Sequence, residues 1–136
     1  MTTLERTVRR PRGLEIPKPS EVEEVVKRIP RGKLMTSNAL RALLARKYRA
    51  VAGLPPTSGL FIRIVARTAA AEMREGRKRI VPYWRIVKEN GTLIDAFPGG
   101  VIEQSMRLLS EGHTLELGKR RSPPRIKDFS QHLVAH

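Results

Sequence analysis

Two groups of residues in this sequence have side chains suited to chemistry or to ligand binding. The first is the run Tyr83–Arg85, in which two aromatic side chains and an arginine follow a proline. The second lies upstream, where three arginines recur at the spacing of one helix face: Arg63, Arg67 and Arg74. A helix lined with arginine, followed by aromatic side chains in a loop, is typical of a nucleic-acid-binding protein with a pocket for a base.

The absence of cysteine limits the reactions available to these residues. The sequence contains no cysteine, so it can form neither a disulfide nor a thiolate nucleophile. The phenol of Tyr83, with an ordinary pKa of about 10, is a poor substitute. The spacing of Glu111, His113, His132 and His136 is not that of metal ligands, and the sequence has no Walker-type phosphate loop and no serine elbow. We therefore expect no catalytic residue, no metal and no cofactor.

The charge of the chain indicates a polyanionic partner. Lysine and arginine together number 27 against 13 aspartates and glutamates, for a net charge of +14. Residues 25–71 contain ten of these basic residues and no acidic one. Because a merely solvated surface normally mixes both signs of charge, we interpret this stretch as a functional basic surface and expect double-stranded DNA as the partner.

A membrane surface is a weaker interpretation of the same charge. The predicted helices have no face rich in tryptophan and phenylalanine, which interfacial helices use. No apolar run approaches the roughly 20 residues that span a bilayer, and the N-terminus lacks an apolar signal core. We therefore expect a cytoplasmic, nucleoid-associated monomer that does not bind membranes.

Hydrophobic spacing predicts four helices that would position these residues. The first has a capping box that begins at Ser20. The second is expected to be capped by Thr36 or Ser37, and the third by Thr57 or Ser58. The expected ranges are 21–28, 37 to the loop at 53, 59–74 and 101–110.

The third predicted helix carries the candidate DNA contacts. Arg63, Arg67, Ala70 and Arg74 share one of its faces. Alanines at 66 and 69–71 add little bulk beside the arginines, so the backbone could come close to a nucleic-acid groove; alternatively, they are good helix formers that pack against a neighbour. With the helix before it, this helix would form an arrangement like a helix-turn-helix.

Short strands, a fourth helix and a basic tail are predicted to follow. Residues 85–88 are expected to form a strand and 89–91 a turn, which together suggest a hairpin. In the fourth helix Ile102, Met106 and Leu109 are expected to face the core. The tail is expected to dock on the body through its apolar residues Phe129, Leu133 and Val134.

Five short motifs occur in an order that resembles the DNA-binding domain of alkylguanine-DNA alkyltransferases and the related alkyltransferase-like proteins. They are IPRGK at 29–33, ARTAAAEMR at 66–74, VPYWRIVKENGTL at 81–93, PGG at 98–100 and LLSEGH at 108–113. The resemblance covers most of residues 21–113. It implies a mainly α fold with a small β wing, a winged helix-turn-helix domain over residues 19–116. A basic arm at 1–18 and a basic tail at 117–136 would flank this domain.

The resemblance also implies roles for individual residues. In that family the recognition helix enters the minor groove, and one of its arginines replaces a base that is flipped into a pocket; Arg67 matches that arginine. Ala70 and Ala71 match small residues that approach the groove. Tyr83 stands where the repair enzymes have the cysteine that accepts the alkyl group, and Trp84 where they have the histidine that activates it. We therefore expect no alkyl transfer.

Two further sites depart from the family pattern: position 37, and the charged segment 76–79, which replaces the family's active-site asparagine loop. Ser37 stands where the family has a tyrosine near the phosphate of the flipped nucleotide. Glu111 matches the acidic member of the family's catalytic relay. Because the cysteine and the histidine of that relay are both replaced, we expect Glu111 to be an ordinary carboxylate at a helix end.

These residues form two candidate sets with two possible functions. The DNA-binding set is Lys33, Thr36, Ser37, Arg63, Ala66, Arg67, Ala70, Ala71, Arg74, Arg77 and Lys78. The pocket set is Tyr83, Trp84, Arg85 and Phe97. If the rings at 83 and 84 stack on an extruded base, the chain is a non-catalytic alkyltransferase-like protein of DNA repair that flips a damaged guanine, with other repair proteins as partners. If the rings fill the pocket, it is an architectural protein that binds duplexes of any sequence.

Overall fold

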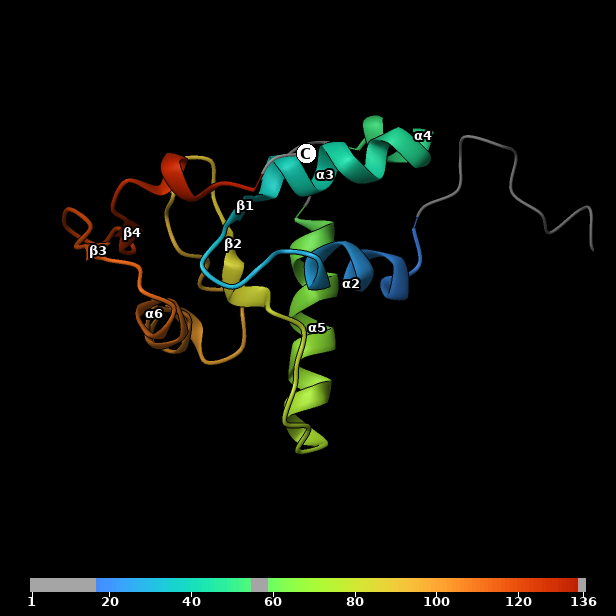
Figure 1. Cartoon of the computed structure of the whole chain (residues 1–136). Coiled ribbons are helices and arrows are strands. Elements are labelled where there is room, and N and C mark those ends of the chain that lie inside the picture. Colours follow the sequence, from blue (N-terminus) through green and yellow to red (C-terminus); the bar gives the residue numbers. More distant parts are fainter. Residues whose placement is uncertain (1–16, 55–58, 135–136) are drawn as a thin grey trace, which may run out of the picture.

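Helices dominate the part of the chain that the computed structural model describes, residues 17–54 and 59–134 (Figure 1). Most of the predicted N-terminal arm and the predicted caps Thr57 and Ser58 lie outside these ranges. Among the described helices, none is both long and apolar enough to cross a membrane. In chain order the elements are α2 (Pro19–Lys27), β1 (Met35–Thr36), α3 (Ser37–Lys47), α4 (Arg49–Ala52), α5 (Leu60–Arg74), the 3-10 helix η2 (Tyr83–Arg85), β2 (Ile86–Val87), α6 (Gly100–Ser110), β3 (Leu115–Glu116), β4 (Arg125–Ile126) and the 3-10 helix η3 (Phe129–His132).

The main helices occur where hydrophobic spacing predicts them. Thr36 caps α3 as predicted, because its hydroxyl accepts the backbone N–H of Ala39 at 3.1 Å. The helix α2 begins earlier than predicted. The carboxylate of Glu21 accepts the backbone N–H of Lys18 at 3.3 Å, so Ser20 lies inside the helix and is not its cap. The predicted second helix is divided into two, since α3 ends at Lys47 and a short helix, α4, covers Arg49–Ala52.

The strands pair differently from the predicted hairpin. The strand β2 pairs in parallel with β1, with Met35 opposite Ile86, and does not pair with the residues that follow the turn. Both residues of β2 are buried, so this strand lies between layers of side chains and has no solvent-facing side. The turn after it is closed by a hydrogen bond from the backbone N–H of Lys88 to the carbonyl of Thr92, at 2.9 Å. The hairpin prediction is therefore wrong.

The C-terminal residues, which we expected to form a tail, contribute structure to the body. The strand β4 pairs antiparallel with β3, and its Ile126 is fully buried. The backbone N–H of Leu34 donates to the carbonyl of His132 at 2.9 Å, and the N–H of Val134 donates to the carbonyl of Leu34 at 2.8 Å. The predicted docking of the apolar tail residues is confirmed for Phe129, Leu133 and Val134.

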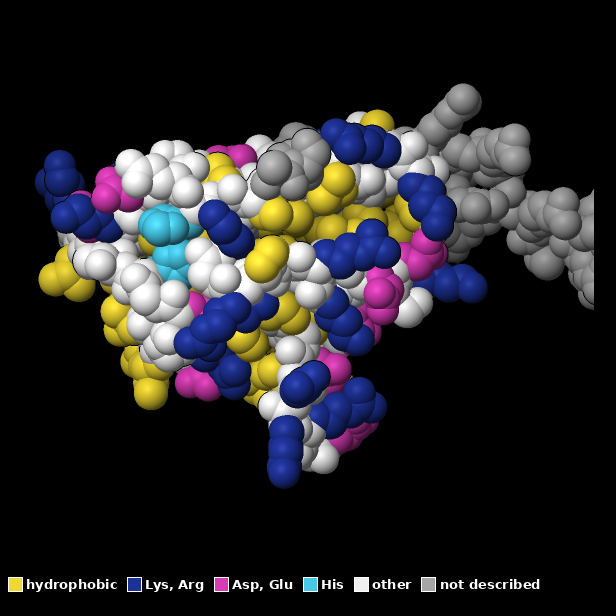
Figure 2. Space-filling model, in the orientation of Figure 1, with side chains coloured by type: hydrophobic (Ala, Val, Ile, Leu, Met, Phe, Trp, Pro, Cys, Tyr) yellow, Lys and Arg dark blue, Asp and Glu magenta, His cyan; other side chains and the backbone are white. Residues whose placement is uncertain are grey.

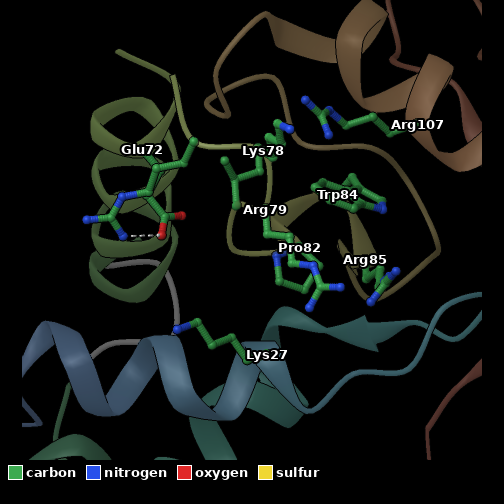
Figure 3. Close-up of a pocket in the computed structure, with 10 residues that line it drawn as sticks. Lys27, Glu72, Lys78, Arg79, Pro82, Trp84, Arg85 and Arg107 are labelled. Atoms are coloured by element: carbon green, nitrogen blue, oxygen red, sulfur yellow. Dashed lines mark hydrogen bonds and ion pairs between the residues drawn. The ribbon is translucent and has the colours of Figure 1, made fainter. Parts of the chain in front are cut away.

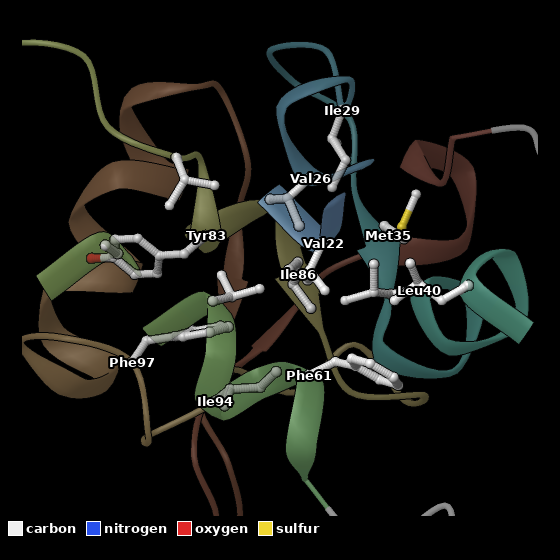
Figure 4. Packing of buried hydrophobic residues seen from close by; sticks show 14 of the residues in the cluster. Val22, Val26, Ile29, Met35, Leu40, Phe61, Tyr83, Ile86, Ile94 and Phe97 are labelled. Carbon is white, nitrogen blue, oxygen red and sulfur yellow. The ribbon is translucent and has the colours of Figure 1, made fainter. Parts of the chain in front are cut away.

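A single face of α5 anchors the main hydrophobic core (Figure 4). Phe61, Val65 and Ala69 are buried at the helical spacing of four residues. They belong to one cluster with Val22 and Val26 of α2, the helix that packs most closely on α5. Because this face is buried, the opposite face of α5 remains available to a ligand.

The helix α6 is rotated relative to the prediction. Ile102, Met106 and Leu109, which we expected to face the core, are 73%, 61% and 53% exposed, whereas Gln104 and Leu108 are buried. The side chain of Gln104 explains the rotation. Its Oε1 accepts the backbone N–H of Ile94 at 2.8 Å, and its Nε2 donates to the carbonyls of residue 86 at 2.9 Å and residue 84 at 3.2 Å. Satisfying three buried backbone groups outweighs the gain from burying larger apolar side chains.

The rotation predicts an unusual pair of mutational effects. Replacing Gln104 by leucine adds an apolar side chain of similar size but leaves buried backbone groups unpaired, so we expect a loss of about 2 kcal/mol or more in the free energy of unfolding. Replacing the exposed Met106 by serine should change that free energy by less than about 0.5 kcal/mol. Urea denaturation measures both values. A larger loss for Met106→Ser than for Gln104→Leu would contradict the observed orientation of α6.

Candidate nucleic-acid interface

The outward face of α5 presents the arginines that the sequence singled out. Arg63, Arg67 and Arg74 are exposed, while Val65 and Ala69 turn inward on the same helix. No carboxylate in the described ranges pairs with Arg67 or Arg74. The alanines of the predicted set lie beside these arginines and are partly buried: Ala66, Ala70 and Ala71. In Figure 2, lysine and arginine side chains gather around the lower end of α5.

A groove of about 950 Å³ opens at the N-terminal end of α5. The start of α3 forms one of its sides and residues 88–90 and 94–96 form another. Ile62 and Ile94 give the groove apolar walls, and Asn38, Asn90 and Asp95 bring polar groups to it. Its size is within the range of small-ligand sites.

Glu89 occupies the N-terminus of α3, a position at which helices commonly bind phosphate. Its Oε2 accepts the backbone N–H of Asn38 at 2.8 Å and the hydroxyl of Ser37 at 3.3 Å. A carboxylate at a helix N-terminus already satisfies the free N–H groups and repels a second anion. The sequence analysis missed this role of Glu89, since no local pattern connects it to a helix more than 40 residues upstream.

Tyr83 and Phe97 fill the interior and do not line a cavity, which corrects the predicted pocket. Both side chains are buried, with ring centroids 5.0 Å apart, and the hydroxyl of Tyr83 donates to the carbonyl of Pro98 at 3.3 Å. Burial raises the pKa of Tyr83, and the positive charge of Arg107 offsets only part of that increase. The phenol is therefore neutral near pH 7 and inaccessible to a substrate.

Trp84 and Arg85 bind Glu111, while the Trp84 ring also packs edge-on against Tyr83, with ring centroids 5.3 Å apart. The indole N–H donates to Glu111 Oε2 at 2.8 Å, and Arg85 donates to the same oxygen from Nη2 at 2.7 Å. The backbone N–H of Gly32 donates to the other oxygen at 3.1 Å, and Arg85 Nη1 donates to the carbonyl of Ile29 at 2.7 Å. Glu111 was expected to be an ordinary helix-end carboxylate, but it joins three segments of the chain.

The environment of Glu111 keeps it ionised. Its side chain is only 2% exposed. Burial alone would raise the pKa of this carboxyl, but hydrogen bonds from Arg85, Trp84 and Gly32 outweigh burial and hold the pKa below its usual value. The stabilisation from this cluster is thus present at neutral pH and is lost as the pH falls through the lowered pKa of Glu111.

A second cavity, of about 690 Å³, lies at the C-terminal end of α5 (Figure 3). Trp84 and Arg85 line it, together with the predicted DNA contacts Arg77 and Lys78. Arg77 pairs with Glu75 at 2.9 Å, whereas Lys78 is exposed. The candidate residues of the sequence analysis are thus divided between two ends of α5.

Two other predicted DNA contacts lie elsewhere. Thr36 is buried and its hydroxyl caps α3, so we assign it to the helix cap and not to a phosphate contact. Lys33 is exposed in the turn after α2, where its backbone N–H donates to the carbonyl of Pro30 at 3.0 Å. Lys33 lines neither cavity.

Comparison with known proteins identifies similar folds among solved structures. No family model and no curated protein matches the sequence. The structure superposes on that of Atl1 from S. pombe in complex with damaged DNA containing O6-carboxymethylguanine, with a TM-score of 0.64 and 17% identity over 87% of this chain and 94% of that chain. The chain has the Atl1 fold. A second S. pombe structure, of ATL in complex with DNA, gives a TM-score of 0.59 and 19% identity over the same shares.

The shared fold supports the mainly helical class that the sequence predicts. The superposition covers most of this chain, whose main helices are α2, α3, α5 and α6. The predicted wing has a different form here. Its strands β1 and β2 are parallel, and the antiparallel pair β3 and β4 is built from the C-terminal residues.

The Glu111 cluster predicts a large loss of stability from a conservative change. Replacing Glu111 by glutamine removes the charge that Arg85 needs and leaves a buried guanidinium without an anion, so we expect the free energy of unfolding to fall by about 3 kcal/mol. The control is Glu103→Gln, which breaks the half-exposed pair with Arg107 and should cost less than about 1 kcal/mol. Thermal denaturation at pH 7 measures both variants. Equal losses would show that the cluster has no special role.

Proposed function

We propose that the chain binds double-stranded DNA through the outward face of α5, inserts Arg67 into the duplex and carries out no alkyl transfer. One observation carries this proposal. Arg67 is exposed, has no carboxylate partner among the described residues, and stands on a face where its neighbours Ala66, Ala70 and Ala71 are small. The fold shared with two DNA complexes of S. pombe alkyltransferase-like protein supports it.

The dimensions of α5 suit a single groove of a duplex. From Arg63 to Arg74 the helix rises about 16 Å, at about 1.5 Å per residue. That length corresponds to about five base pairs, at about 3.4 Å for each base pair. Arg63 and Arg74, which flank Arg67 on this face, can contact phosphates while the alanines let the helix backbone approach.

An extruded base would enter the groove at the N-terminal end of α5. This groove is next to Arg63, one helical turn from Arg67, and it combines apolar walls with the polar side chains of Asn38 and Asp95. Extrusion costs a few kcal/mol and less at a damaged pair, so an arginine that fills the gap and a groove that holds the base can offset the cost. The groove takes the place of the predicted aromatic pocket, because Tyr83 and Phe97 are buried against each other.

The chain lacks the groups that alkyl transfer requires. Transfer to protein needs a nucleophile activated by a neighbouring base. The sequence has no cysteine, the phenol of Tyr83 is buried with a raised pKa, and Trp84 has no basic nitrogen. The role we propose is therefore recognition of a damaged guanine in DNA repair, after which other repair proteins would act.

One observation favours a second function. The contact between Tyr83 and Phe97 closes the interior of the domain, as expected for a duplex-binding protein without a base pocket. Such a protein would bind by phosphate neutralisation alone, so its affinity would fall steeply with salt and would not depend on damage.

The effect of Arg67→Ala distinguishes the two functions. We expect this variant to lose affinity for a duplex with one O6-methylguanine by at least about tenfold, or about 1.4 kcal/mol, more than for the matched undamaged duplex. Fluorescence anisotropy at fixed salt measures both affinities. The control is Arg46→Ala, which removes the same charge from the exposed side of α3 and should weaken both duplexes equally. If Arg67→Ala lost the same affinity for the damaged and the undamaged duplex, Arg67 would have no role in base flipping, and the second function would be favoured.

A further inference from the structure

The cavity at the C-terminal end of α5 concentrates positive charge from four segments of the chain. It has one carboxylate, Glu72, in its lining. That carboxylate is engaged, because it accepts the backbone N–H of Val81 at 2.7 Å and lies 3.5 Å from Arg77. The cationic side chains that line the cavity are Lys27, Arg77, Lys78, Arg79, Arg85 and Arg107.

Two of these cations are available to a ligand. Lys78 and Arg79 are exposed, and neither pairs with a carboxylate in the described ranges. Like charges held together in a concave site raise the local concentration of anions. A guanidinium beside an ammonium group suits a phosphate in particular, because the planar fork of arginine donates two hydrogen bonds to its oxygens.

The remaining lining is apolar. Ile80, Pro82 and Trp84 form it, and the guanidinium of Arg107 lies 4.6 Å from the centroid of the Trp84 ring. Figure 3 shows Lys78, Arg79 and Arg107 around Trp84. A volume of about 690 Å³ is ample for a ring joined to a sugar and a phosphate. We infer that this cavity binds a phosphorylated nucleotide, with its phosphate on Lys78 and Arg79 and its base or sugar against the apolar wall.

The inferred site is separate from the groove proposed for an extruded base. The two cavities share no lining residue. They lie at opposite ends of α5. The nucleotide inferred for the cationic cavity is therefore not the base extruded at Arg67. It is either free in solution or unpaired in a single strand.

Trp84 allows a direct test, because it is the only tryptophan of the chain and it lines the cavity. The probes are thymidine monophosphate, a single-stranded oligothymidylate and inorganic pyrophosphate, each titrated against Trp84 fluorescence. We expect saturable quenching by a thymidine probe, weakened at least about tenfold in the Lys78→Ala/Arg79→Ala variant. The matched control, Arg63→Ala/Arg67→Ala, loses the same number of charges from the other end of α5 and should quench as the original protein does.

The three probes also distinguish a free nucleotide from an unpaired strand as the ligand, and they define the results that would contradict the inference. Quenching by the monophosphate identifies a free nucleotide, and quenching by the oligonucleotide alone identifies an unpaired strand. Pyrophosphate that binds as tightly as either thymidine probe would show that the apolar wall contacts nothing, and would overturn the inference. Three other results would also overturn the inference: no quenching by either thymidine probe, unchanged quenching in the Lys78→Ala/Arg79→Ala variant, or loss of quenching in the Arg63→Ala/Arg67→Ala variant. These results leave the duplex-binding proposal untouched, since that proposal depends on Arg67.

Discussion

The ionised carboxylate of Glu111 holds the segment whose Trp84 and Arg85 line the cationic cavity. It binds the turn after α2 through Gly32 and the segment η2 through Trp84 and Arg85. Trp84 and Arg85 are thereby held at the end of α6, and Tyr83 packs edge-on against Trp84 and against Phe97, with ring centroids 5.3 and 5.0 Å apart. These rings fill the interior of the domain, and the groove at one end of α5 shares no lining residue with the cationic cavity at the other.

Carboxylates that serve the fold also shape the surface charge. Glu72, Glu89 and Glu111 each accept a backbone N–H from another segment of the chain. Glu72 and Glu111 also pair with Arg77 and Arg85. In the described ranges, no carboxylate pairs with Arg67, Arg74 or Lys78. The net charge of +14 is consequently presented to a ligand by exposed arginines and lysines, which suits a protein that attracts phosphate.

Local patterns in the sequence predicted those parts of the structure that local interactions determine. The helices α3 and α5, the cap at Thr36 and the arginine face of α5 follow from helical spacing alone. The rotation of α6 does not, because Gln104 is placed by backbone groups ten and more residues away. The same limit applies to Glu89 and Glu111, whose partners lie 51 and 79 residues distant in sequence. A prediction from hydrophobic periodicity considers only apolar residues. It cannot identify a buried polar side chain that forms hydrogen bonds with backbone groups of a loop distant in sequence.

The central claim is that the outward face of α5 is the surface that meets duplex DNA. The most direct test is to follow the backbone amide signals of the ¹⁵N-labelled protein by NMR while a short duplex with one O6-methylguanine is added. The account predicts that the largest shifts fall on α5 around Arg63, Arg67 and Ala70 and on the groove residues beside it. Shifts confined to other elements, with α5 unchanged, would contradict it.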